Sequence, residues 1–341
     1  MAQQAAALPS ANRRSPMRFF KKDYGPAWAL FLSAIALMVY VLVEYNFTVF
    51  VRVSMNGIVL GLTYLLVALG LALMWGVMHL LNFAHGQFFM MGAFSVWYFM
   101  VRVDVLTKYL PIVPAYLISL VLAMVIVGMM GTLVERYLFR RFGGDLLPAL
   151  LISLGLGLIL AQAMILAFGL LTKSIPTAFA GSQRFFGVSL TNERLALVIS
   201  ALVLLVALWW LVSHTKFGRA MVAIREDQTA AALQGIDIGK FRLIVMFIGS
   251  ALAAVAGGLY GPVFQVTPEM GTGPMATAFA IIVLGGLGSL PGAGIAAFFL
   301  GFVESFGATF LGATIAQFFT FAVIILVLIF KPTGLFGHGG H

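Results

Sequence analysis

Long apolar runs separated by short polar segments occupy most of this chain. A helix needs roughly 20 apolar residues to cross a bilayer, because each backbone amide must bond within its own segment. The pattern therefore predicts an all-α polytopic membrane protein with about ten, or eight to ten, transmembrane or re-entrant helices. The runs are 27–43, 54–77, 83–101, 111–134, 146–171, 195–212, 243–263, 275–287, 292–311 and 315–330, of which 275–287 is short enough to be re-entrant.

The basic residues between the runs predict an orientation. They gather in 1–24, at 136–141 and in the loop 214–240. The positive-inside rule places all three segments and both termini in the cytoplasm if the number of crossings is even, and either ten spans or eight spans with two half-helices satisfy it. We expect a disordered basic segment 1–24, one transmembrane domain 25–332 and a flexible tail 333–341. The first run is expected to be a retained span rather than a signal peptide.

Composition excludes several classes of protein. Of the 341 residues 62% are hydrophobic and 9% are charged, whereas soluble domains carry about 25% charged residues. The net charge is +9, but the basic residues form short clusters instead of one basic face, so lipid is an expected partner and nucleic acid is not. The chain has no cysteine, and neither a nucleophile with its base nor a spaced metal-ligand set is visible. We therefore expect no catalytic, cofactor or metal site, although His79 and His85 leave a membrane enzyme as a minor alternative.

A polar segment interrupts the apolar sequence at 82–87. Polar groups at membrane depth are expensive, and they persist where they line a water-filled cavity or bond across helices. The segment is therefore a candidate substrate pathway, and spacing alone leaves open the alternative of a short cytoplasmic turn capped by Asn82. The candidate residues are Asn82, Phe83, His85, Gly86 and Gln87.

A second interruption, 285–294, is too rich in Gly and Pro to be continuous helix. It is interpreted either as a hinge or half-helix end beside the transport route, with Gly285, Gly286 and Gly288 as pathway candidates, or as a tight turn between two packed helices. If the two halves of the chain repeat each other, 82–92 and 285–294 are where the repeat would be sought.

The loop 214–240 favours a short amphipathic helix at about 217–236, with Gly235 as its stop. Such a helix suits the groove of a cytoplasmic partner, and the alternative is a helix lying on the lipid surface. A further carboxylate, Glu304, falls inside a span. It is interpreted as a proton-coupling site or, preferably, as one end of an interhelical hydrogen bond. Gly57 and Gly61 form a small-residue pair that favours close helix packing.

These segments resemble the LivH-type permeases of high-affinity branched-chain amino acid ABC importers over about residues 50–337. The resemblance rests on Met55-Asn56-Gly57, Asn82-Phe83-Ala84-His85-Gly86, Met91-Gly92-Ala93-Phe94, Gly218-Arg219-Ala220, Arg225-Glu226-Asp227, Leu233-Gln234-Gly235-Ile236 and Lys331-Pro332-Thr333-Gly334-Leu335. The long N-terminal extension and the His-containing tail depart from the family pattern.

The resemblance implies a permease of the bacterial inner membrane and a set of partners. These are a second, LivM-like permease, a periplasmic solute-binding protein and two cytoplasmic ATPase subunits that bind ATP and Mg²⁺. This chain has no phosphate-binding Gly-Lys motif of its own. The resemblance makes Asn82 and His85 pathway candidates. Its ATPase-coupling candidates are Gly218, Arg219, Arg225, Glu226, Asp227 and Gly235.

The main alternative is an ion- or proton-coupled secondary transporter or channel for a small solute. It would need ions or protons bound at depth. The other spans lack carboxylates, which weakens proton or sodium coupling, but backbone carbonyls at broken helices could still bind sodium. For the ABC permease that the resemblance implies, leucine, isoleucine and valine are the default solutes.

Overall fold

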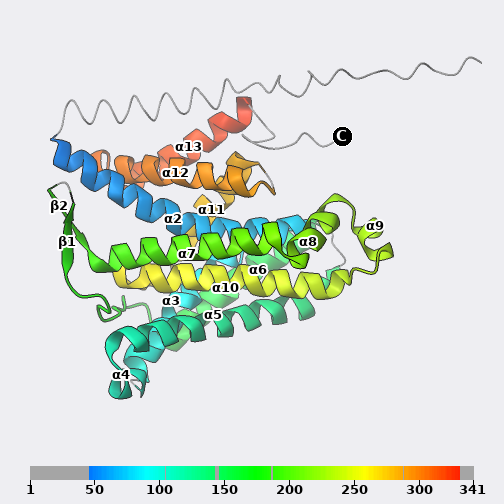
Figure 1. Cartoon of the computed structure of the whole chain (residues 1–341), viewed down its shortest axis with the longest axis horizontal. Helices are drawn as coiled ribbons and strands as arrows, with labels where there is room; N and C mark the ends of the chain where they lie inside the picture. Colours follow the sequence, from blue (N-terminus) through cyan, green and yellow to red (C-terminus); the bar gives the residue numbers. More distant parts are fainter. Residues whose placement is uncertain (1–45, 104, 143–145, 186, 287, 331–341) are drawn as a thin grey trace, which may run out of the picture.

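Helices that run nearly side by side build the protein (Figure 1). The computed structural model describes residues 46–103, 105–142, 146–185, 187–286 and 288–330. The predictions for 1–24, for the run 27–43 and for the tail 333–341 lie outside these residues. Six of the described helices are long and apolar enough to cross a membrane. They are α2 (Phe47–Met78), α5 (Ile112–Tyr137), α6 (Leu146–Phe168), α7 (Asn192–His214), α10 (Ile238–Phe264) and α12 (Leu290–Phe310).

Shorter elements connect or flank these helices. Two lie within the bundle, α3 (His85–Trp97) and α11 (Thr272–Gly285), and α13 (Ala313–Phe330) follows α12. The predicted helical membrane fold is thus confirmed, whereas the count of ten and the orientation stay predictions. The remaining short helices are the π-helix η2 (Tyr98–Arg102), α4 (Val105–Tyr109), the 3-10 helix η3 (Phe139–Phe142), α8 (Lys216–Glu226) and α9 (Gln228–Leu233).

A small β-hairpin departs from the all-α prediction. Strands β1 (Ser182–Phe185) and β2 (Val188–Thr191) pair antiparallel, with Phe185 opposite Val188. Side chains alternate along β2, so that Val188 and Leu190 are buried while their neighbours are exposed. The hairpin lies at the end of the bundle opposite to α8 and α9 (Figure 1). Four-residue strands inside a long polar loop leave no apolar run in the sequence, which explains why they were missed.

Helices α2 and α12 pack closely through glycines. A Cβ on Gly301 would lie 2.6 Å from Gly61 Cα and 2.7 Å from Gly57 O, so the helices meet backbone to backbone. Beside this contact the Tyr64 hydroxyl donates a 2.7 Å hydrogen bond to Glu304 Oε1. The structure confirms both the close packing predicted for Gly57 and Gly61 and the interhelical hydrogen bond preferred for Glu304.

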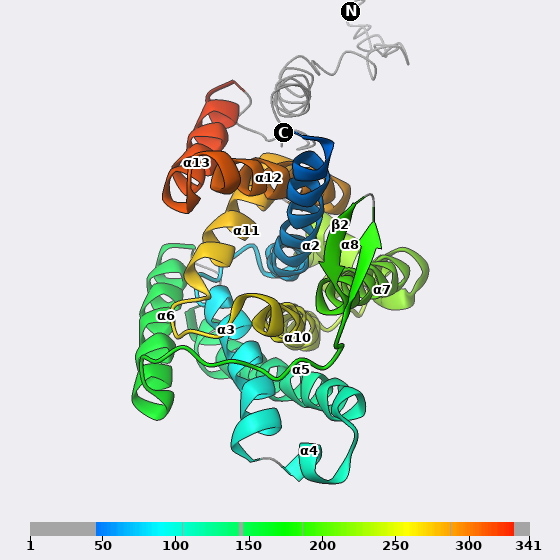
Figure 2. The same cartoon turned by 90° about the vertical axis from the view of Figure 1, so that its left-hand side faces the viewer.

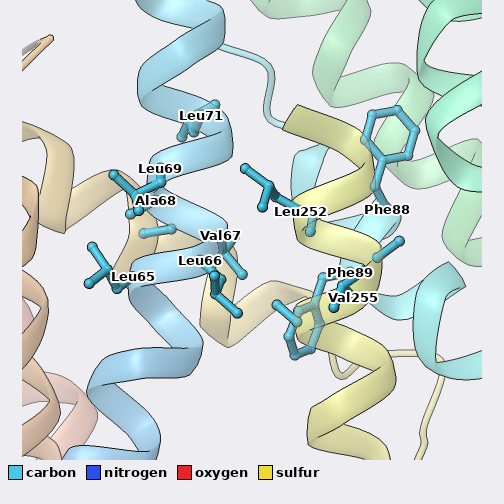
Figure 3. Close-up of a cluster of buried hydrophobic side chains, with 14 of the residues drawn as sticks. Leu65, Leu66, Val67, Ala68, Leu69, Leu71, Phe88, Phe89, Leu252 and Val255 are labelled. Atoms are coloured by element: carbon cyan, nitrogen blue, oxygen red, sulfur yellow. The ribbon is translucent and has the colours of Figure 1, made fainter. Parts of the chain in front are cut away.

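Helix α10 occupies the middle of the bundle, between α2, α3 and α5 (Figure 2). Leu66 and Val67 of α2, Phe89 of α3 and Leu252 and Val255 of α10 form part of the apolar core between these helices (Figure 3). Because α10 contacts both the long helix α2 and the short helix α3, it holds the broken part of the chain in place.

A buried ion pair joins α5 to α10. Arg242 Nε lies 2.6 Å from Glu135 Oε1, and the Glu135 side chain is only 1% exposed. We expect Arg242→Met to destabilise the protein by about 3–5 kcal/mol, because it strands a buried carboxylate. The double variant Glu135→Leu/Arg242→Met should recover most of that loss in a thermal unfolding assay in detergent. A double variant no more stable than the single one would contradict this explanation.

Candidate functional site

The segment between α2 and α3 turns back into the bundle. Helix α2 ends at Met78, and His79 adopts a left-handed conformation with φ of 52°. The next helix begins at His85, whose Nε2 lies 3.1 Å from the carbonyl oxygen of Val67. That carbonyl is about 16 Å back along α2 from its end, at 1.5 Å per residue. The short helix α3 therefore starts about a third of the way back along α2 from its end, and the alternative of a solvated turn is excluded because Asn82 and His85 are fully buried.

Local hydrogen bonds hold the return segment. Asn82 Oδ1 accepts from the Ala84 amide at 3.0 Å, and the Asn82 carbonyl accepts from the His85 amide at 3.1 Å. From α6, Ser153 Oγ accepts a hydrogen bond from the Phe83 amide at 3.1 Å. The backbone of this polar break is thus paired despite its depth in an apolar bundle.

Three side-chain atoms at the break are buried and unpaired. Asn82 Nδ2, His85 Nδ1 and Gln87 Oε1 have no hydrogen-bond partner in the described structure. Most buried polar groups in proteins are paired, so such a cluster calls for an explanation. These atoms supply a donor and acceptors that a polar solute could use. No group of three or more His, Cys, Asp or Glu side chains in the described ranges comes close enough to hold a metal ion.

A second break of the same design follows α10. That helix ends at Phe264, and Gln265 has a positive φ of 73°. His79 and Gln265 are the non-glycine residues with positive φ in the part of the chain that is described. A return segment follows, and the short helix α11 then begins at Thr272. The segment 265–271 is therefore the structural counterpart of the first break. The sequence led us to expect this counterpart at 285–294, and that expectation is wrong.

The two short helices meet at their N-terminal ends. A Cβ on Gly86 would lie 2.3 Å from Gly271 O, and one on Gly271 would lie 2.1 Å from Gly86 O. No side chain fits at either position. Phe83 and Phe279 also face each other across this junction, with ring centroids 5.6 Å apart. The breaks before α3 and α11 thus form one continuous site within the bundle.

The Gly-rich segment lies elsewhere. Gly286 and Gly288 adopt positive φ of 96° and 82°, and Ser289 caps α12 by accepting from the Gly292 amide at 3.2 Å. This is the tight turn between packed helices that the sequence left as an alternative. The Gly288 carbonyl accepts a 3.0 Å hydrogen bond from Arg225 of α8. The structure therefore brings Gly288 into contact with α8, while Gly285 packs against Gly292.

The predicted surface helix at 217–236 is two helices instead of one. Helix α8 ends at Glu226, and Asp227 is extended, with its Oδ1 accepting from the amides of Thr229 and Ala230 at 2.8 and 3.0 Å. Because Asp227 is extended and caps α9, α8 ends just before it. Helix propensity alone did not indicate this break. Gly235 has a φ of 83° just after the end of α9, consistent with its predicted role as a stop.

Helices α8 and α9 are fastened to the end of the bundle. Phe217 stacks on Phe241 of α10 at 5.3 Å, and Gln228 Nε2 donates to the Val77 carbonyl near the end of α2 at 3.0 Å. A Cβ on Gly218 would lie 1.8 Å from Val212 O, so the connection from α7 has no room for a side chain. These contacts make α8 and α9 a surface unit that touches α2, α7, α10 and the 286–289 turn.

The outer surface of this unit is exposed. Arg219 and Glu226 face solvent, whereas Gly218, Arg225 and Asp227 also have the internal roles described above. Leu233 is 86% exposed at the end of α9. It was not among the predicted coupling residues, although an apolar residue in a polar loop is a signal that the sequence does contain.

Comparison with known proteins gives the family. The model described as "Branched-chain amino acid transport system / permease component" matches residues 53–328. The high-affinity branched-chain amino acid transport system permease protein BraD of Pseudomonas aeruginosa is 33% identical over 291 residues, covering 83% of this chain and 94% of that protein. LivH of Escherichia coli K12, with the same description, is 32% identical over 302 residues, 86% of this chain and 97% of LivH. The ribose import permease protein RbsC of that strain is 32% identical over 135 residues, 37% of this chain. No solved structure matches the chain.

Proposed function

Since the chain belongs to the permease family of branched-chain amino acid transport systems, we propose that it is the membrane permease subunit of an ATP-driven importer of branched-chain amino acids. Its place is the bacterial inner membrane, beside a second permease subunit. Two cytoplasmic ATPase subunits bind ATP and Mg²⁺, and a periplasmic binding protein delivers the solute.

The charge distribution supports an orientation. Lys216, Arg219, Arg225 and Lys240 lie on or beside α8 and α9, at the opposite end of the bundle from the hairpin (Figure 1). By the positive-inside rule this end faces the cytoplasm, which puts the hairpin on the periplasmic side. We propose, as the basic clusters of the sequence indicate, that both termini lie on this cytoplasmic side, which requires an even total of crossings.

One observation carries the proposal: a polar break with unpaired buried groups sits in an apolar bundle, and a docked helical unit covers one end of that bundle. We propose that the solute passes the break at Asn82, Phe83, His85, Gly86 and Gln87. The unit of α8 and α9 receives the motion of the ATPase. In this proposal Gly285, Gly286 and Gly288 do not line the solute route. They belong to the connection through which Arg225 transmits the motion of the ATPase.

Capping by Asp227 gives a matched pair of variants. Asp227→Ala removes the side-chain acceptor at the start of α9 and should weaken that helix by about 0.5–2 kcal/mol, whereas Asp227→Asn keeps an acceptor. We expect Asp227→Ala to lower the amount of solute taken up per ATP hydrolysed in proteoliposomes, and Asp227→Asn to remain near the unmodified protein. Equal defects in both variants would show that the charge, and not the cap, is required.

Uptake of labelled solute tests the proposed function. The complete complex is reconstituted with its binding protein, and uptake of leucine, isoleucine and valine is measured with ATP inside the vesicles. We expect saturable uptake of all three, mutual competition among them and no competition by ribose. Ribose uptake without branched-chain amino acid uptake would overturn the solute assignment.

A further inference from the structure

We propose that Glu304 of α12 binds the ammonium group of the transported amino acid, and that Tyr64 of α2 orients the Glu304 carboxylate for this contact. The inference rests on the proposed function and names the part of the solute that the chain recognises inside the membrane. It concerns a charged side chain that belongs neither to the polar break at 82–87 nor to the surface unit of α8 and α9.

The Glu304 carboxylate is paired through one of its two oxygens. Its Oε1 accepts the 2.7 Å hydrogen bond from the Tyr64 hydroxyl. Its Oε2 has no hydrogen-bond or ion-pair partner among the described residues. The Tyr64 bond therefore fixes the carboxylate and leaves Oε2 as an acceptor for a further donor.

Glu304 also lacks a positive partner in the ranges that the structure describes. Glu135, another carboxylate inside the bundle, is paired with Arg242 at 2.6 Å, whereas Glu304 takes part in none of the ion pairs there. An ionised carboxylate at membrane depth costs at least about 2.5 kcal/mol, and such groups are usually paired. The ammonium group of an amino acid would supply the missing charge together with three N–H donors.

The accessible part of Glu304 opens toward the interior of the bundle. Leu300 and Gly307 share its face of α12, at spacings of four and three residues, and both are buried. Ile295 lies on the opposite face and is 53% exposed. Glu304 is itself partly exposed. Because the Ile295 face is the outer one, the space beside the carboxylate belongs to the interior, where a solute can reach it.

Tyr260 of α10 adds to the surroundings of this carboxylate. Helix α2 lies between α10 and α12 (Figure 2), and Tyr260 interacts electrostatically with Glu304. The Tyr260 ring packs against Phe89 of α3 at 5.4 Å and stacks on Phe264 at 4.3 Å. A free carboxylate oxygen, phenol oxygens and aromatic rings are groups that recognise an ammonium ion.

This cluster lies about one helical turn from the polar break, toward the hairpin end of the bundle. On α2, Tyr64 precedes Val67, whose carbonyl contacts His85, by three residues or about 4.5 Å. On α3, Phe89, which contacts Tyr260, follows His85 by four residues or about 6 Å. Since α2 begins at the hairpin end (Figure 1), a solute that enters from that side meets the carboxylate before the break.

Two variants distinguish the charge from the hydrogen bond. Glu304→Gln removes the charge but keeps an oxygen that accepts from Tyr64, whereas Tyr64→Phe keeps the charge and removes the donor. In the complete complex reconstituted with its binding protein, we expect Glu304→Gln to lower leucine uptake per ATP hydrolysed by at least about tenfold, as the loss of a charged contact implies. Tyr64→Phe should lower it by less than about threefold, and both variants should keep the ATP hydrolysis that the binding protein stimulates.

A purely structural role for Glu304 predicts the opposite order, because only the hydrogen bond would then matter. Near-normal uptake by Glu304→Gln, or the loss of its stimulated ATP hydrolysis together with its uptake, would therefore overturn the inference. Absence of ATP-driven leucine uptake by the unmodified complex would instead overturn the proposed function, so the two failures are distinguishable.

Chemical protection tests which group of the solute reaches Glu304. Dicyclohexylcarbodiimide modifies carboxyl groups in apolar surroundings, and mass spectrometry of the complete complex reports the modified fraction, with the Arg242-paired Glu135 as an internal reference. We expect leucine and leucinamide, which carry an ammonium group, to protect Glu304, and isocaproate, which lacks one, to leave its modification unchanged. Equal protection by all three, no protection by leucine, or resistance of Glu304 to the reagent without solute would each contradict an ammonium site.

Discussion

Replacing Gly257 with leucine should prevent the chain from reaching its folded state. A Cβ at this position would lie 1.8 Å from the carbonyl oxygen of Phe89, and a backbone atom cannot give way as a flexible side chain can. Overpacking a core usually costs about 1–3 kcal/mol, and more when backbones must separate. We expect Gly257→Leu to be lost as aggregate or degraded protein in detergent size-exclusion chromatography.

A matched control for this substitution is available on α6. Nothing lies within 4 Å of a Cβ on Gly155, so Gly155→Leu adds the same side chain to another spanning helix without a clash. It should give the same monodisperse peak as the unmodified protein. If Gly257→Leu behaved like Gly155→Leu, the close contact between α3 and α10 would be contradicted.

Replacing Leu233 with aspartate should disconnect the permease from its ATPase. Leu233 is 86% exposed on α9, and a single apolar anchor at the centre of an interface can contribute about 2 kcal/mol or more to binding. We expect Leu233→Asp to lose most of the ATPase subunit in co-purification and to lose ATP-driven uptake, while the permease itself remains folded.

The neighbouring substitution Gln234→Asp distinguishes the loss of the apolar side chain from the gain of a negative charge. Gln234 is exposed beside Leu233, so this variant introduces the same negative charge without removing an apolar contact. It should retain ATPase binding much better than Leu233→Asp. Equal losses would mean that charge repulsion, and not an apolar anchor, explains the effect.

The sequence predicted the long helices well, because the length of an apolar run indicates the length of a membrane-spanning helix. The run 195–212 lies within α7 (Asn192–His214), and 243–263 lies within α10 (Ile238–Phe264). A span must be apolar over a fixed length, so its limits are visible in one sequence. The run 275–287, which is short enough to be re-entrant, corresponds to α11 of 14 residues.

What the sequence could not show is how deep a break lies. Asn82 and His85 were visible as polar residues between two runs, but only the contact with Val67 places them about a third of the way back along α2 from its end. The second break, 265–271, looks like an ordinary external loop in the sequence, because its depth comes from the Gly86–Gly271 contact between segments far apart in the chain.

Motif reading also could not separate internal from external roles in the coupling loop. Arg225 and Asp227 belong to one motif with Glu226, yet Arg225 bonds the 286–289 turn and Asp227 caps α9. Glu226 and Arg219 face solvent and remain available to a partner. Hydrogen-bond partners and exposure decide such roles, and neither can be read from spacing.

The source of energy for transport tests the central claim most directly. Uptake of labelled leucine is measured in proteoliposomes containing either the purified chain alone or the complete complex, under imposed proton and sodium gradients and with or without ATP. We predict uptake only by the complete complex, only with ATP, and no response to either gradient. Leucine uptake by the chain alone, driven by a proton or sodium gradient, would contradict the claim that this permease takes its energy from a partner ATPase.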